Sequence, residues 1–293
     1  MRFCLYALIL LFTGGYKLSA QSIDLEKIQW IHGSDPCSEN KDPGLQVIRY
    51  DASTYIIRQN KCLNYEAPFI YLFIGMEKAL LVDTGAKAPD AAFPLFETIS
   101  KILKEDRSEP IPLMVIHTHG HSDHNAGDHQ FTNKQNVRVI PAQKDSIFDF
   151  FKLKDWPYTQ MTFDLGSREL IIIPIPGHDE QSIALYDSHT KWLLTGDTIY
   201  PGRLYVRNAK AFRESIARLN TFSKNHRIDY LMGNHIEMTR TNGIDYPTGT
   251  TYQPNEHALP LGLDTLEELH RACEKMGNTV VYEVHDDFIV VPK

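Results

Sequence analysis

The sequence has no strong excess of charge, few cysteines and no long apolar run after its amino-terminal segment. Its formal net charge is −7, which argues against the basic surface of a nucleic-acid-binding domain. No stretch beyond residue 20 is apolar enough to span a bilayer, and no Gly-x-Ser-x-Gly motif marks a serine nucleophile. We therefore expect neither a nucleic-acid partner nor a membrane span in the mature chain. The composition, 42% hydrophobic and 23% charged, is that of an ordinary globular protein.

The first 20 residues differ from the rest of the chain. Arg2 precedes an apolar run over residues 4–12, and small residues close the segment at 18–20. This layout is typical of a signal peptide, which predicts a secreted or periplasmic protein with a mature domain over residues 21–293. A buried amino-terminal strand is the alternative.

Three of the four cysteines lie outside this leader. In an oxidising compartment Cys37 and Cys62 could form a disulfide, but the sequence does not decide whether they do. Cys273 lies in a helical pattern and is expected to be a buried, unpaired residue.

The most informative stretch is His117–His124, where four histidines and an aspartate follow the apolar residues 114–116. Histidine and carboxylate side chains are ligands that zinc prefers. On an extended segment His119 and His121 point to the same side, whereas the adjacent Asp123 and His124 diverge. One loop could therefore supply ligands to two metal ions. A solvated histidine-rich loop is the alternative.

The pattern His119-x-His121-x-Asp123-His124 resembles the HxHxDH signature of the metallo-β-lactamase-fold hydrolases. The resemblance runs from about residue 46 to 235. It implies an α/β (α+β) protein, a four-layer αββα sandwich of two similar halves, with the site at one edge. It also implies that Asp83, in a strand-ending Asp-Thr-Gly, supports the metal-binding histidines.

Three later strand ends extend the resemblance: Pro176-Gly177-His178, Thr195-Gly196-Asp197 and Gly233-Asn234-His235. They imply that His178 completes the first metal site, that His235 completes the second, and that Asp197 bridges both. His257 competes with His235 but does not follow a strand. The implied ligands are His119, His121 and His178 for the first metal, Asp123, His124 and His235 for the second, and Asp197 for both.

The activity implied by the resemblance is that of a hydrolase with two Zn²⁺ per chain, in which metal-bound hydroxide attacks an ester, lactone or thioester carbonyl of a small-molecule substrate. Asp123 is also a candidate for orienting the nucleophile. Tyr200, three residues after Asp197, has the spacing of a lactonase tyrosine that donates to the substrate carbonyl, although a packing role is nearly as well supported.

Other activities stay open on the same scaffold. The β-lactam hydrolases of this fold generally lack a bridging carboxylate, so Asp197 disfavours a class B β-lactamase-like amide hydrolase. A phosphodiesterase or sulfatase, and a non-catalytic binding module, are further alternatives. No basic cluster of the glutathione-binding kind stands near the carboxyl end.

The apolar patterns predict the elements that surround this site. Residues 237–263 should form a loop on the substrate side. Within residues 264–293, strands over 279–284 and 288–291 should finish the second sheet or pair with another chain, so a homo-oligomer stays open. The expected helices cover residues 91–104, 142–151, 209–222 and 263–276, and the expected strands include 46–50, 54–57, 69–74, 79–82, 137–140, 170–175, 182–186, 192–194 and 228–232.

Overall fold

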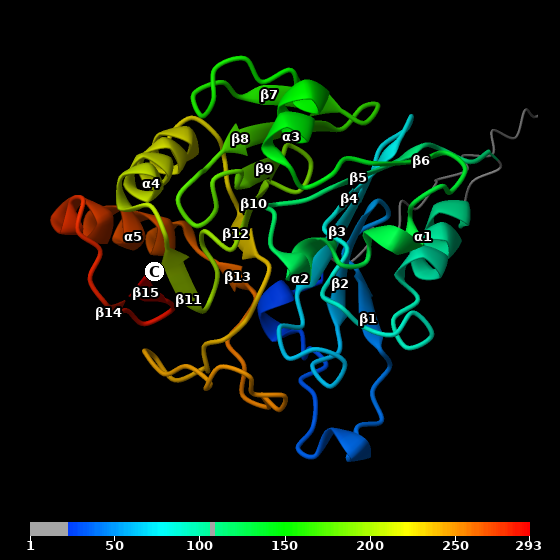
Figure 1. Cartoon of the computed structure of the whole chain (residues 1–293), viewed down its shortest axis with the longest axis horizontal. Coiled ribbons are helices and arrows are strands. Elements are labelled where there is room, and N and C mark those ends of the chain that lie inside the picture. Colours follow the sequence, from blue (N-terminus) through cyan, green and yellow to red (C-terminus); the bar gives the residue numbers. More distant parts are fainter. Residues whose placement is uncertain (1–22, 106–108) are drawn as a thin grey trace, which may run out of the picture.

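Two six-stranded sheets form the centre of the protein, in a computed structural model that describes residues 23–105 and 109–293 (Figure 1). The signal peptide predicted over residues 1–20 lies outside the described residues. The first sheet has the order β1 (Leu45–Arg49), β2 (Thr54–Gln59), β3 (Phe69–Ile74), β4 (Ala79–Val82), β5 (Leu113–Ile116) and β6 (Val137–Val139). The second has the order β13 (Pro260–Leu261), β12 (Tyr230–Gly233), β10 (Trp192–Gly196), β9 (Ile183–Asp187), β8 (Glu169–Pro174) and β7 (Met161–Asp164).

Each half mixes antiparallel and parallel pairs in a related way. Strands β1 to β4 are antiparallel neighbours, and β4, β5 and β6 then run parallel. In the second half β7 to β10 are antiparallel neighbours, and β10 pairs with β12 in parallel. Parallel neighbours end at the same sheet edge, so the loops that follow these strands are brought together.

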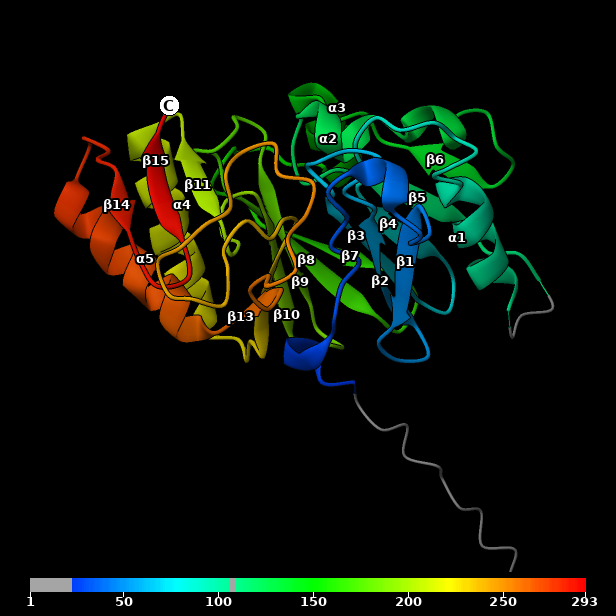
Figure 2. The same cartoon turned by 90° about the horizontal axis from the view of Figure 1, so that it is seen from below.

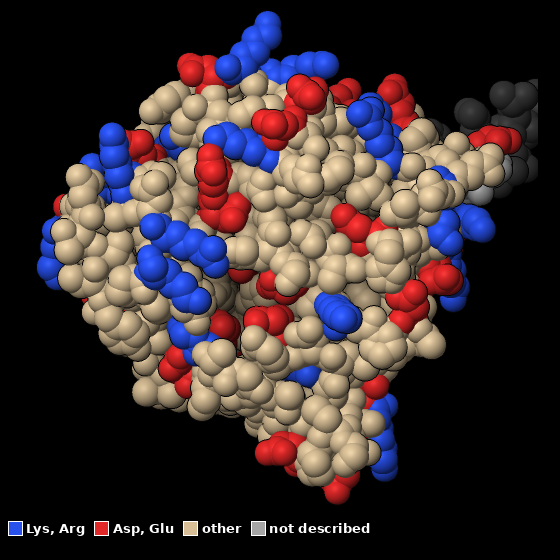
Figure 3. All heavy atoms as spheres, viewed as in Figure 1, with Lys and Arg blue, Asp and Glu red and all other residues tan. Residues whose placement is uncertain are grey.

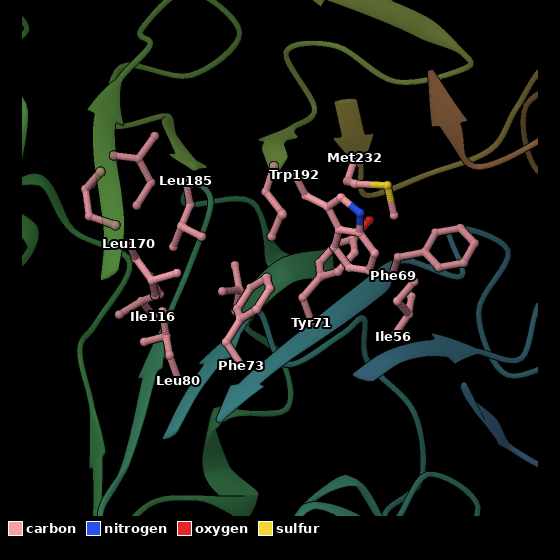
Figure 4. Close-up of a cluster of buried hydrophobic side chains, with 14 of the residues drawn as sticks. Ile56, Phe69, Tyr71, Phe73, Leu80, Ile116, Leu170, Leu185, Trp192 and Met232 are labelled. Atoms are coloured by element: carbon pink, nitrogen blue, oxygen red, sulfur yellow. The ribbon is translucent and has the colours of Figure 1, made fainter. Parts of the chain in front are cut away.

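The main core lies between the two sheets. Aromatic residues of β3 and Trp192 of β10 meet there with aliphatic residues of both halves (Figure 4). All six residues of β3 are buried, because its other face is covered as well. A strand buried on both faces reads as a continuous apolar run, which is why Phe69–Ile74 could be predicted from the sequence.

Helices cover the outer faces of the sheets (Figures 1 and 2). Helix α1 (Leu95–Lys104) packs on the first sheet, and α4 (Ala209–Ser223) and α5 (Leu263–Met276) pack on the second. The predicted four-layer αββα sandwich of two similar halves is therefore confirmed. Shorter helices are α2 (Ser122–Asn125) and α3 (Lys144–Phe151), with 3-10 turns at Leu25–Lys27, Cys37–Glu39 and Asp128–Gln130.

Helix α1 is shorter than the predicted range 91–104. It begins at Leu95, directly after Pro94, which is its N-cap residue. Proline has no backbone N–H and is tolerated only in the first turn, so it marks the start of this helix.

A third, three-stranded sheet corrects the expectation for the carboxyl end. Its order is β11 (Arg203–Val206), β15 (Ile289–Pro292) and β14 (Glu283–Val284). The last two strands therefore do not extend the second sheet, because β15 pairs in parallel with β11 instead. The sequence patterns do not predict β11 or β7, since each has only four residues and no continuous apolar run.

The amino-terminal segment is linked to the first half of the protein by a disulfide and to the loop over residues 237–263 by a β-bridge between Gly33 and Tyr252. Cys37 and Cys62 form the disulfide that the sequence left undecided, and Cys273 is buried and free, as the sequence predicted. The loop is held by a buried ion pair between Arg58 and Glu256. None of the helices among the described residues is long and apolar enough to cross a membrane.

Candidate metal centre

The predicted ligands come together at one edge of the sandwich, although their loops are far apart in the sequence. Strands β5, β8, β10 and β12 end at residues 116, 174, 196 and 233, and a ligand-bearing loop follows each one. Two groups of side chains result, each with ligand atoms within 4.8 Å of one another. The first group is His119, His121, His178 and Asp197, and the second is Asp123, His124, Asp197 and His235.

The first group contains three imidazoles and one carboxylate oxygen. Nδ1 of His121 lies 2.8 Å from Nε2 of His119 and 3.1 Å from Nε2 of His178. Oδ2 of Asp197 lies 3.8 Å from Nε2 of both His119 and His178. Ligand atoms at about 2.0–2.1 Å from a tetrahedral zinc ion are about 3.3–3.4 Å apart, so this spacing fits such an ion.

The second group has two imidazoles and two carboxylates. Oδ2 of Asp123 lies 3.1 Å from Nε2 of His124 and 3.2 Å from Nε2 of His235. The other oxygen of Asp197, Oδ1, lies 3.4 Å from each of these nitrogens. Asp197 therefore presents one oxygen to each group, which is the arrangement that a bridging carboxylate requires.

Backbone carbonyls orient the two histidines that arrive from the second half. Nδ1 of His178 donates to the carbonyl of Tyr205 at 3.0 Å, and Nδ1 of His235 donates to the carbonyl of Glu66 at 2.9 Å. A carbonyl can only accept, so the proton of each neutral ring stands on Nδ1. The lone pair of Nε2 then points to the site, as a metal ligand needs.

Asp83 orients the metal loop itself. Its Oδ2 accepts from Nδ1 of His124 at 3.0 Å, from Oγ1 of Thr118 at 2.9 Å and from Nδ2 of Asn234 at 2.7 Å. Its Oδ1 accepts from the backbone N–H of Thr118 at 2.8 Å. The side chain is fully buried and supports the loop as expected, with Asn234 as a partner that the sequence did not reveal.

The electrostatics of the two groups differ. Burial lowers the pKa of His119, His121 and His178, so these rings stay neutral and keep a free lone pair. Burial also acts against a charge on His235, but Asp197 and Asp123 outweigh it and raise its pKa to about 9. The second group thus attracts positive charge strongly.

Asp197 also has an unsatisfied atom. Its Oδ1 is buried without a well-directed hydrogen bond among the described residues. A buried carboxylate oxygen in this position is stabilised by a cation. The donor atoms, their spacing and this oxygen fit a pair of borderline divalent cations such as zinc.

A pocket of about 150 Å³ opens over the two groups. Besides ligands, its wall contains Tyr200, which its spacing from Asp197 had marked, and residues that the sequence did not indicate because they follow no motif. The latter are Glu66, Tyr205, Arg207, Glu237 and Lys293.

Tyr200 lies beside the site with its hydroxyl already engaged. The hydroxyl donates to the carbonyl of Arg203 at 2.6 Å and lies 3.1 Å from Oε2 of Glu237. Its ring contacts that of His235, with 5.7 Å between the ring centres. Its role as a donor to substrate stays a prediction.

The two other histidines that the sequence analysis considered, His117 and His257, lie outside both groups. His117 is buried, with Nδ1 3.1 Å from the carbonyl of His124 and Nε2 3.2 Å from a carboxylate oxygen of Asp128. His257 instead lies beside Asp287, at 3.2 Å, so His235 rather than His257 reaches the metal groups.

Comparison with known families agrees with this geometry. A model of the metallo-beta-lactamase superfamily matches residues 65–229, more than half of the chain. The chain belongs to the metallo-beta-lactamase superfamily. The superfamily match ends before His235, whose place in the site rests on the structure.

Curated relatives of this superfamily member cover part of its length. It is 28% identical to acyl-coenzyme A thioesterase MBLAC2 of Homo sapiens over 169 residues, which are 46% of this chain and 59% of that protein. It is 29% identical to hydroxyacylglutathione hydrolase of Anaeromyxobacter dehalogenans over 167 residues, 52% of this chain and 57% of that protein. The match thus spans less than two thirds of these relatives.

Solved structures share the fold. The metallo-beta-lactamase from Pontibacter korlensis matches with a TM-score of 0.51 and 19% identity, over 78% of this chain and 99% of the other. The metallo-beta-lactamase from Hirschia baltica matches with a TM-score of 0.54 and 16% identity, over 79% and 98%. At such identities the likeness concerns the fold and not the substrate.

Proposed function

We propose that this protein is a hydrolase with two zinc ions that cleaves a thioester or a related ester or lactone. The proposal rests mainly on the position of Asp197, whose Oδ1 faces the second ligand group and whose Oδ2 faces the first. Bound there, two zinc ions supply Lewis acidity and lower the pKa of a water molecule toward neutrality.

The residues of the chain have separate parts in this reaction. The neutral imidazoles of the first group and the acidic second group would hold the cations, while Asp83 and the carbonyls of Tyr205 and Glu66 fix the orientation of the rings. Asp123 is the carboxylate proposed to orient the nucleophile, because its Oδ2 faces the second group.

Tyr200 is the proposed donor to the substrate carbonyl. Its hydroxyl has one proton, which is now given to the carbonyl of Arg203. The role therefore requires that the hydroxyl turn toward the substrate during binding, away from an acceptor at 2.6 Å. Tyr200→Phe should then lower kcat with little change in the affinity of the two metal sites.

The choice of a thioester is supported by two observations. Two groups of relatives are named as thioesterases or hydroxyacylglutathione hydrolases, although this chain covers only about half of their length. The bridging carboxylate is present, whereas the resemblance associates β-lactam hydrolysis with its absence.

We also propose that the mature chain works outside the cytoplasm. The signal-like segment over residues 1–20 motivates this, and the disulfide between Cys37 and Cys62 supports it, because such bonds persist in oxidising compartments. Cell fractionation with mass measurement of the mature chain tests it: a cytoplasmic protein with both thiols reduced would contradict export.

Metal analysis and a substrate panel test the activity. The purified chain should contain close to two zinc ions, and the zinc form should hydrolyse thioesters faster than phosphodiesters or β-lactams of similar size. One iron ion or no metal would refute the zinc assignment. Turnover of β-lactams alone would refute the substrate assignment while leaving the metal centre intact.

A further inference from the structure

The third sheet places two basic residues side by side at the wall of the metal pocket. Strands β11 and β15 run parallel, with Val206 opposite Pro292, and the N–H of Lys293 donates to the carbonyl of Val206 at 3.1 Å. Arg207 follows Val206 directly, and Lys293 follows Pro292. Adjacent strands are about 4.8 Å apart, so the two backbones leave the sheet as neighbours.

The backbone of Arg207 is also tied to the metal ligand His178. The N–H groups of Arg207 and Asn208 both donate to the carbonyl of Gly177 at 3.0 Å. The carbonyl of Tyr205 accepts from Nδ1 of His178. The same short segment therefore orients a metal ligand and carries the arginine, so the position of Arg207 relative to the site is set by the fold.

This packing depends on Gly177. Its φ is +147°, and a Cβ atom there would lie 2.4 Å from Cα of Phe212. Only glycine permits such a close approach of the two backbones. The loop that carries His178 thus packs directly against helix α4, which begins two residues after Arg207.

No carboxylate forms an ion pair with either basic side chain among the residues that the structure describes. Both residues are exposed, and Nζ of Lys293 lies 4.5 Å from the ring centre of Tyr205. The nearby Glu237 is already paired, with Oε1 2.6 Å from Nη2 of Arg203. Both cationic side chains line the metal pocket, so an anion bound in the pocket could be attracted by both charges.

We propose that Arg207 and Lys293 bind an oxyanion of the substrate, a carboxylate or a phosphate, close to the group that is hydrolysed. This inference rests on the proposed function and narrows its substrate to an anionic thioester or ester. A guanidinium can hold either oxyanion through two parallel hydrogen bonds, while the ammonium adds a point charge. Basic side chains gather beside the central hollow, whose interior shows acidic atoms (Figure 3).

A second hollow indicates where the rest of the substrate lies. A groove of about 600 Å³ adjoins the metal pocket, and Arg207 and His178 belong to the walls of both. Trp156 and Tyr158 line this groove, and Tyr158 is 65% exposed. The oxyanion would therefore lie between the reacting carbonyl and a part of the substrate that rests along these rings.

Paired substrates that differ by one charge test the proposal. One pair is the succinyl and butyryl thioesters of the same thiol, and the other is the butyryl thioester of pantetheine with and without its terminal phosphate. The wild-type zinc enzyme should prefer the anionic member of one pair by about tenfold or more in kcat/KM, mainly through KM. The pair that shows the preference identifies carboxylate or phosphate.

Variants then assign the preference to residues. Arg207→Gln and Lys293→Gln should each reduce the ratio of anionic to neutral turnover toward one. Arg227→Gln is the matched control, because Arg227 is 77% exposed and pairs with Asp229 beyond the end of α4. It should keep the wild-type ratio and activity.

The outcomes separate this inference from the proposed function. Hydrolysis of both members at equal kcat/KM, or a ratio that both variants leave unchanged, would overturn the inference while the proposed function stands. If no thioester, ester or lactone is hydrolysed, the proposed function fails, and calorimetric binding of succinate and inorganic phosphate still tests the oxyanion site. Arg207→Gln should weaken that binding about tenfold, and equal binding by wild type and variant would overturn the inference.

Discussion

Replacing Asp83 with asparagine tests how strongly a buried carboxylate supports the metal centre. Asp83 accepts four hydrogen bonds from three residues and is fully buried, at a φ of +70°. Asparagine adopts this left-handed conformation readily, whereas alanine would add backbone strain. Asp83→Asn therefore changes the charge and one hydrogen-bonding atom with little other disturbance.

The hydrogen bonds of Asp83 determine how far Asp83→Asn should lower the free energy of unfolding. With its oxygen in place of Oδ2, the asparagine keeps the bonds from His124, Thr118 Oγ1 and Asn234, and its amide N–H₂ meets the N–H of Thr118. In the opposite orientation the amide N–H₂ would face the N–H donors of His124 and Asn234, so that orientation is less stable. The N–H of Thr118 and the introduced N–H₂ group are left without an acceptor, which lowers the free energy of unfolding by at least about 1–3 kcal/mol. Loss of the charge beside His124 should weaken zinc binding at the second group by about 10–100-fold.

Urea unfolding of the metal-free protein and chelator competition for zinc measure the two effects. Asp90→Asn is the matched control, because Asp90 also contacts a histidine, His129 at 2.7 Å, but is 61% exposed. We expect it to change stability by less than about 0.5 kcal/mol and to leave zinc affinity unaltered. Wild-type affinity for both zinc ions in Asp83→Asn would refute the reasoning.

Three further predictions follow from the same contacts. Asp197→Ala should lower kcat at least about 100-fold and release zinc, whereas His117→Gln should cost far less; equal losses by kinetics and metal analysis would show that the bridge is misassigned. Burial alone would raise the pKa of Asp187, but hydrogen bonds from Arg168 hold this pKa below its ordinary value. The ionised carboxylate therefore stabilises the folded state above about pH 4, and this contribution is lost as the pH falls through the depressed pKa. Asp187→Asn should therefore flatten the acid limb of the stability curve, and an unchanged limb would contradict this. Cys37→Ala opens a loop with a sequence separation of 25 and should lower the free energy of unfolding by about 3 kcal/mol in urea titration, whereas a loss under about 0.5 kcal/mol would count against the bond's importance.

Local sequence patterns predicted much of the fold and of the candidate site. The run over residues 69–74 predicted a strand because its residues are apolar without interruption, and the structure buries all six. The ligand types of the loop His117–His124 were visible because they lie within one short segment after a strand. Motif resemblance then nominated His178, Asp197 and His235, which the structure brings into the two groups.

Other features depended on partners that no local pattern names. Strand β11 has four residues of mixed polarity, and it becomes a strand because β15, more than 80 residues later, pairs with it. The expectation that the last strands finish the second sheet was therefore wrong. No role was predicted for Asn234 from the sequence, but its side chain donates to Asp83 from the other half of the molecule.

The sequence alone determined which atoms are offered to a metal, because ligand type is a property of each residue and each ligand follows an apolar strand. The periodicity of apolar residues, which is a local property, also predicted most helices and strands, whereas the four layers were implied by the resemblance of the motifs. Tertiary structure decided how the offered atoms combine: which oxygen of Asp197 faces which group, and that Arg207 stands beside Lys293. The physical reason is that strand pairing and the packing of two sheets are set by the free energy of the whole core, to which distant residues contribute together.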